Sequence, residues 1–122
     1  MDEVKREPAK SFKDLIGWQK AHQMVLDVYK MTKNFPKEET YGLTSQFRRS
    51  AVSVAANISE GFKKKSPADK LRIFNISQGS LSETEYYVLL AEDLKYGKMD
   101  FLMEQTDEVG RLLESYMKAF NK

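Results

Sequence analysis

A short run of lysines is the clearest candidate for chemistry in this chain of 122 residues. Lys63, Lys64 and Lys65 are consecutive, and an ammonium group binds a phosphate oxygen as a point charge. The candidate phosphate-binding residues are this run and its basic neighbours, with Arg48 as an exposed contributor: Arg48, Lys63, Lys64, Lys65, Lys70 and Arg72. They predict contacts to the backbone of RNA or DNA that weaken with added salt. The alternative is an ordinary solvated loop, because lysines between helices also occur in proteins that bind nothing.

The charge of the chain is unevenly distributed. The formal net charge is only +2, yet residues 43–75 contain seven basic and two acidic residues, whereas residues 76–122 contain five basic and nine acidic residues. This asymmetry suits a polyanionic partner, and it suits head-to-tail contacts between identical subunits equally well. Charge alone therefore leaves both interpretations open.

Residues suited to catalysis or metal binding are scarce. The chain has no cysteine, so it has no disulfide, thiol nucleophile or thiolate metal site. Its single histidine, His22, follows Gln19 where a di-metal helix bundle would need a glutamate. Glu83 and Glu85 are two residues apart and point in different directions on a helix, so they do not form a paired acid and base. We expect a protein that is not an enzyme and that has no cofactor or metal.

Residues 46–61 predict a helix that is buried on more than one side. Only three of these residues are charged, whereas a surface helix carries more lysine and glutamate. A helical wheel gives the segment an apolar face and, beside it, a polar stripe. The stripe consists of Gln46, Arg49, Ser53, Asn57 and Glu60. It could simply be solvated, but Val52 and Ala56 flank it, and we therefore expect a buried or interfacial polar network.

The next helix is expected to supply the other half of this network. If the chain folds back about the lysine run, Arg49 lies within one turn of Glu83, which predicts a charge-assisted pair shielded from water. Gly79 then lies opposite Ser50 and Ala51, which predicts a close contact between small residues. The predicted structural network consists of Gln46, Arg49, Ser53, Asn57, Glu60, Gly79, Ser80 and Glu83.

Four helical segments must position these groups. They are expected at about residues 11–34, 43–61, 66–97 and 99–120. Ser11 begins a capping box, Gly61 is a candidate C-terminal cap, and Ser66 followed by Pro67 is a strong helix start. Short connections favour antiparallel neighbours, so the fold class is an all-α, antiparallel, up-down-up-down four-helix bundle. Residues 1–11 are expected to form a flexible N-terminal arm and residues 12–121 a single domain.

The first residues do not resemble a signal peptide. They are charged from the second position onward and have no apolar core segment, and no stretch of the chain approaches the roughly 18 apolar residues of a membrane span. We therefore expect a cytoplasmic protein with no membrane partner.

Several short motifs in this chain resemble a known family. They are Trp18-Gln19-Lys20-Ala21, Phe35-Pro36, Tyr41-Gly42-Leu43, Gln46 with Arg49, Asn57-Ile58-Ser59-Glu60-Gly61, and Gly79-Ser80-Leu81 with Glu83. Together they are similar to the small four-helix-bundle proteins encoded in intervening sequences of bacterial large-subunit ribosomal RNA genes. The resemblance extends from about Phe12 to Phe120.

The resemblance implies an assembly and a set of relatives. It implies a ring-like homopentamer that buries the unusual surfaces of the second and third helices. It also implies a relation to the accessory variability determinant of diversity-generating retroelements, which binds a reverse transcriptase and nucleic acid. The family's motif positions are Arg49, Asn57, Glu60, Gly61, Gly79, Ser80 and Glu83 here. The resemblance implies no established catalytic role for any of these positions, and most of them are interpreted as structural.

Two functions are therefore open. The first is a non-enzymatic oligomer that binds the backbone of RNA or DNA through basic loop residues. The second is a protein-interaction scaffold or accessory subunit for a reverse transcriptase or another RNA-processing partner. It rests on a surplus of aromatic residues on the third and fourth helices, which are Tyr86, Tyr87, Tyr96, Phe101, Tyr116 and Phe120. These aromatic residues could equally seal contacts between subunits.

Overall fold

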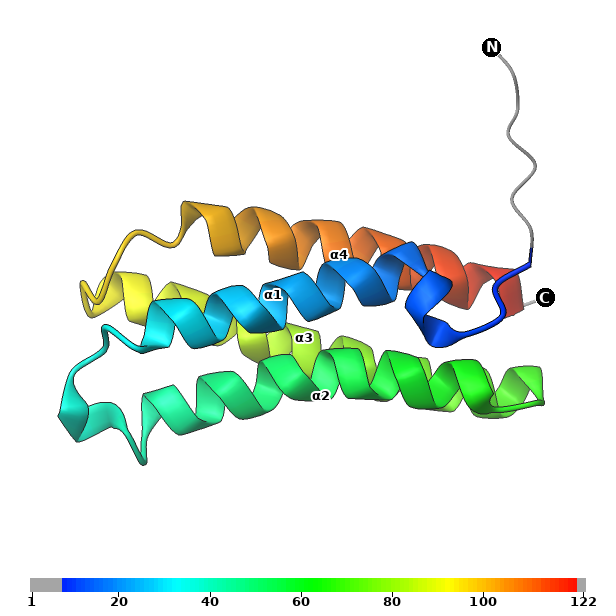
Figure 1. The fold of residues 1–122 in the computed structure, drawn as a ribbon, viewed down its shortest axis with the longest axis horizontal. Helices are drawn as coiled ribbons and strands as arrows, with labels where there is room; N and C mark the ends of the chain where they lie inside the picture. The colour runs from blue at the N-terminus through cyan, green and yellow to red at the C-terminus, as the bar shows by residue number, and fades with distance from the viewer. Residues whose placement is uncertain (1–7, 121–122) are drawn as a thin grey trace, which may run out of the picture.

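Four long helices make up the structure, a computed structural model that describes residues 8–120. They are α1 (Ile16–Thr32), α2 (Leu43–Lys63), α3 (Pro67–Asp93) and α4 (Asp100–Phe120), with short 3₁₀ helices at Phe12–Asp14 (η1) and Lys37–Glu39 (η2). Consecutive helices run in opposite directions (Figure 1). Residues 8–120 contain no strand. The prediction of an all-α protein with four helices is confirmed.

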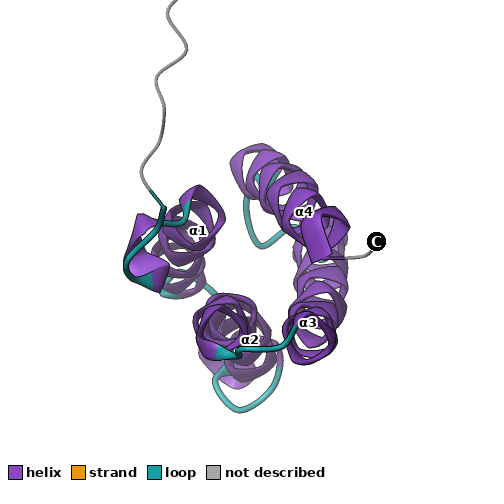
Figure 2. Ribbon diagram, turned by 90° about the vertical axis from the view of Figure 1, so that its right-hand side faces the viewer, coloured by secondary structure: helices purple, strands orange, loops and turns teal. Residues whose placement is uncertain are grey.

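Each helix packs against two neighbours. The pairs are α1 with α2, α2 with α3, α3 with α4, and α4 with α1, and the end-on view shows this order around the bundle (Figure 2). The largest fully buried side chains include Phe47, Met24, Ile58 and Leu102, which come from three helices and form one continuous core. None of the helices within residues 8–120 combines the length and apolar character that crossing a bilayer requires.

The first capping box exists but does not begin α1. The Ser11 hydroxyl accepts from the amide of Lys13, and the Asp14 carboxylate accepts from the amide of Ser11. Leu15 then adopts an extended conformation, so the box begins η1 and α1 begins only at Ile16. The predicted arm at residues 1–11 lies partly outside the described residues, as does Asn121 at the end of the predicted domain.

The start of α3 is confirmed, whereas its predicted end is wrong. Ser66 accepts from the amide of Asp69, and Pro67 occupies the first helical position. The helix was expected to reach residues 96–97 but ends at Asp93. Lys95 adopts a φ of 63°, the left-handed conformation that often terminates a helix.

The expectation that Gly61 caps α2 is also wrong. The helix continues to Lys63, and Gly61 is a buried helical residue. A Cβ atom at this position would lie only 2.6 Å from the ring of Phe74 on α3. The absence of a side chain at Gly61 therefore allows α2 and α3 to approach closely near the lysine run.

Candidate nucleic-acid interface

The lysine run lies at one end of the bundle. Lys63 is the last residue of α2, Lys64 is its extended C-cap, and Ser66 already begins α3. Lys63 and Lys65 are exposed and Lys64 is half-buried. The same end of the bundle carries the start of α1 and the end of α4 (Figure 1).

Further exposed cations lie at this end. Lys10 and Lys13 precede α1, and Lys118 lies in the last turn of α4. The sequence reasoning missed these three residues, although an antiparallel four-helix topology places both termini beside the connection between α2 and α3. We call the following set the basic end: Lys10, Lys13, Lys63, Lys64, Lys65, Arg72 and Lys118. The same segments of the chain contain fewer acidic residues, namely Asp14, Glu60, Asp69 and Glu114.

Arg72 lies in the second turn of α3, next to the lysine run, and its charge is largely free. Its nearest ion-pair partner is Asp69, one turn earlier, at 4.0 Å, and both side chains are more than half exposed. An exposed ion pair of this length contributes little free energy. The guanidinium of Arg72 therefore stays available to an anion in solution.

Lys70 is a structural residue instead. Its ammonium group donates to the carbonyl oxygens of Phe62 at 2.7 Å and Gly61 at 3.3 Å. It also lies over the rings of Phe62 and Phe120, and burial lowers its pKa below the ordinary value. Lys70 thus satisfies carbonyl groups at the C-terminus of α2, and we expect it to stabilise the bundle rather than to bind a phosphate as the sequence predicted.

Arg48 is likewise committed to a local contact. Its Nε donates to the Thr32 hydroxyl at 2.8 Å and its Nη2 donates to the Tyr29 carbonyl at 3.3 Å. The guanidinium also lies 4.6 Å from the centre of the Tyr29 ring. Arg48 is half-buried and joins α2 to α1 near the start of α2, so it lies apart from the lysine run at the other end of that helix. That Arg48 binds a phosphate stays a prediction.

The predicted polar network exists in part. The hydroxyls of Ser53 on α2 and Ser80 on α3 are hydrogen-bonded at 2.8 Å. Asn57 donates to the Ser53 carbonyl at 2.8 Å and to the Ser53 hydroxyl at 3.0 Å. These half-buried groups lie along the seam between α2 and α3, as expected for helices that meet at this stripe.

Deeper hydroxyl groups complete the network. Thr84 donates to the Ser50 hydroxyl at 2.9 Å, and Ser77 donates to the Val54 carbonyl at 2.8 Å. Ser50, Ser77 and Thr84 are buried. The sequence reasoning missed them as network members, although Ser77 and Thr84 are seven residues apart and so share one face of α3.

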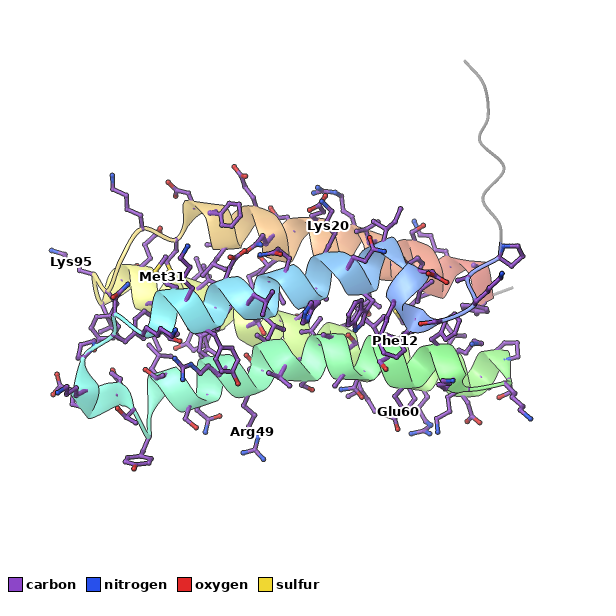
Figure 3. All side chains as sticks on the ribbon, viewed as in Figure 1. Phe12, Lys20, Met31, Arg49, Glu60 and Lys95 are labelled. Carbon is purple, nitrogen blue, oxygen red and sulfur yellow. The ribbon has the colours of Figure 1, made fainter. Side chains whose placement is uncertain are left out.

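The predicted pair of Arg49 with Glu83 is absent from the described residues. Both side chains are exposed, and Figure 3 shows Arg49 and Glu60 extending from α2 away from the bundle. Gln46 is exposed as well. Folding back about the loop sets the height of a residue along the helix but not the direction of its side chain, and Arg49 points outward.

The expected contact of Gly79 with small residues is wrong as well. A Cβ atom at Gly79 would meet nothing within 4 Å, and the residue is exposed. The close approach of α2 and α3 occurs at Gly61, where the ring of Phe74 fills the space.

Most of the aromatic surplus is used inside the subunit. Tyr87, Tyr96, Tyr116 and Phe120 pack against the core. Tyr96 donates to Glu39 at 2.8 Å, which raises the pKa of Tyr96, and the Tyr116 hydroxyl accepts from the amide of Gly17. Tyr86 and Phe101 are left, with 56% and 60% of their surfaces exposed.

Metal-ligating residues do not cluster within residues 8–120, where no group of three or more His, Asp or Glu side chains is arranged to hold an ion. His22 is exposed and stacks on Trp18, with ring centres 4.9 Å apart. This contact gives His22 a surface packing role on α1.

The comparisons with known proteins agree with the sequence motifs. The model of the 23S rRNA-intervening sequence protein family matches residues 13–115. No curated protein matches the chain. A similar solved structure is that of a protein with unknown function from the S23 ribosomal protein family of Bacteroides thetaiotaomicron VPI-5482. It is 26% identical, with a TM-score of 0.76, and the match covers 84% of this chain and 99% of that one.

Proposed function

Because this chain belongs to the 23S rRNA-intervening sequence protein family, we propose that it is a non-enzymatic, oligomeric helical protein that binds the phosphate backbone of RNA or DNA. The binding surface is the basic end. The observation that carries this proposal is the gathering of exposed cations from three separate parts of the chain at one end of the bundle.

The electrostatics of the basic end support this proposal. Asp14 already accepts from the amides of Lys10 and Ser11, and Asp69 is the distant partner of Arg72. Cations that exceed their acidic neighbours attract a polyanion and release its counterions on binding. The lysine side chains provide no geometry for reading bases, so the binding is expected to depend little on sequence.

Self-association would multiply this charge. The seam surface between α2 and α3 consists of Arg49, Ala56, Ile76, Gly79 and Glu83, all of them exposed. A glycine inside a helix costs about 1 kcal/mol relative to alanine, and nothing in the described chain fills the space beside Gly79. We propose that a second copy covers this surface. The ring-like pentamer implied by the family resemblance would then present five basic ends to one nucleic acid.

Replacing Lys63, Lys64 and Lys65 together by alanine tests the proposed binding surface. Affinity for structured RNA and duplex DNA, measured by fluorescence anisotropy, should fall by at least tenfold because three phosphate contacts are lost. The matched control replaces Lys30, Lys33 and Lys37, exposed lysines toward the opposite end, and should bind duplex DNA normally. Undiminished binding by the Lys63, Lys64 and Lys65 variant would show that the basic end is not the site.

The accessory-subunit alternative, for a reverse transcriptase or another RNA-processing protein, has less support. It would rest on Tyr86 and Phe101, since the other aromatic residues of α3 and α4 pack within the subunit. The proposed relation to the accessory factor of diversity-generating retroelements rests on the motifs alone.

A further inference from the structure

A cleft at the start of α2 carries a net positive charge from two arginines. Tyr29, Tyr41, Ser45, Arg48 and Arg49 line its volume of about 500 Å³ together with two threonines. None of these residues carries a carboxylate, whereas the clefts beside α4 each contain at least one. This cleft is therefore suited to an anionic ligand.

Two side chains in this cleft have the chemistry to contact a nucleotide. Tyr41 is 95% exposed, so both faces of its ring are accessible for stacking. Arg48 is held by Thr32 and Tyr29, and these two bonds use two of the five N–H donors of a guanidinium. The remaining donors are fixed in direction before any ligand arrives, which reduces the entropy lost on binding.

We propose that this cleft binds one nucleotide of single-stranded RNA or DNA, with the base stacked on Tyr41 and the phosphate bound by Arg48. The Ser45 hydroxyl, which is exposed beside them, donates a further hydrogen bond to the phosphate. This inference rests on the proposed nucleic-acid binding and adds the class of strand. A base can stack on a protein ring only if it is unpaired or removed from its own stack.

The cleft and the basic end lie toward opposite ends of α2. The 21 residues of α2, Leu43–Lys63, span about 31 Å at 1.5 Å per residue. A strand long enough to reach both places would gain affinity from the second contact without any new interaction at the first. The basic end holds any strand, and the cleft favours a single strand over a duplex.

The test compares a fluorescently labelled adenine homopolymer with a duplex of the same length. Tyr41→Ala should lower affinity for the single strand about tenfold and leave affinity for the duplex unchanged. Tyr41→Phe should bind as the wild type does, because stacking uses the ring. The matched control is Tyr86→Ala, which removes an exposed tyrosine from α3 outside the cleft and should change neither affinity.

Three outcomes would overturn this inference. If Tyr41→Ala leaves the ratio of single-strand to duplex affinity unchanged, the cleft does not bind the nucleotide. The proposal that the basic end binds nucleic acid is then unaffected. If Tyr41→Ala changes the molar mass measured by light scattering, a second copy covers the ring. If the wild type binds neither probe, the proposed function fails and this inference fails with it.

Discussion

The donors of a basic side chain decide what that residue can bind. Lys70 and Arg72 are two residues apart in α3, yet Lys70 directs its donors at the end of α2, whereas Arg72 is exposed beside a distant carboxylate. A sequence shows that both are charged but not which one is already hydrogen-bonded. Lys70 therefore contributes to the stability of the bundle, and Arg72 is free to contact a phosphate.

Lys70→Met should separate these roles. Methionine keeps the packing against Phe62 and Phe120 but removes the bonds to two carbonyl groups, so the free energy of unfolding should fall by about 1 kcal/mol. Affinity for nucleic acid should not change. Chemical denaturation and anisotropy measure the two effects, and Lys63→Met should behave in the opposite way. A Lys70→Met protein of normal stability and reduced affinity would refute the structural role.

At the scale of the helix, Gly61 and Gly79 differ in what surrounds them. Gly61 lies under the ring of Phe74, which is itself buried and cannot move aside easily. Gly79 faces open space on the neighbouring helix. The first allows α2 and α3 to meet, and the second has no structural reason within the described chain.

The same substitution at these two glycines should have opposite effects. Gly61→Ala should lower the free energy of unfolding by about 1–3 kcal/mol, because its Cβ would overlap Phe74. Gly79→Ala should raise the free energy of unfolding of the dissociated subunit by about 1 kcal/mol, since alanine is the better helix former. Denaturant unfolding at low protein concentration measures both. A stabilising Gly61→Ala would mean that the helices are not held at this distance.

The helices could be predicted because their signals are local. Ser66 and Pro67 fix the start of α3, and the stripe containing Ser53 and Asn57 marks the side of α2 that faces α3. The direction of Arg49 could not be predicted, since it depends on how α2 is rotated against two neighbours at once. The 3₁₀ turn after Ser11 was missed because a capping box does not specify the kind of helix that follows.

Of the basic end, only the central lysine run could be predicted from the sequence. The lysine run is visible in the sequence, but the grouping of Lys10, Lys13 and Lys118 with it depends on the folded topology. The cleft at the start of α2 could not be predicted from the sequence either, because it forms only where the end of α1 places Tyr29 and Thr32 beside Arg48.

For the whole molecule, the exposed seam surface between α2 and α3 predicts how copies associate. Arg49 and Glu83 are exposed on adjacent helices and form no ion pair within the described residues. In an assembly they can pair across the interface, where losing one partner typically costs 2–5 kcal/mol. Self-association would also cover Ile76, which is 46% exposed in the single chain.

A charge exchange tests this interface. Arg49→Glu and Glu83→Arg should each lower the molar mass in solution, because each places like charges opposite one another. The double variant should restore the assembly, since the pair is re-formed with its signs reversed. Sedimentation velocity measures the effect, and exchanging Lys20 and Glu108, an exposed pair within one subunit, is the control. Single variants that assemble normally would disprove this contact.

The central claim is that the basic end binds a phosphate backbone, and the salt dependence of duplex DNA binding tests it most directly. The logarithm of the association constant should fall linearly with the logarithm of salt concentration, with a slope of about −0.9 per neutralised phosphate. For the variant with alanine at Lys63, Lys64 and Lys65, the magnitude of the slope per subunit should be smaller by about 2 to 3. Equal slopes for the two proteins would contradict the account.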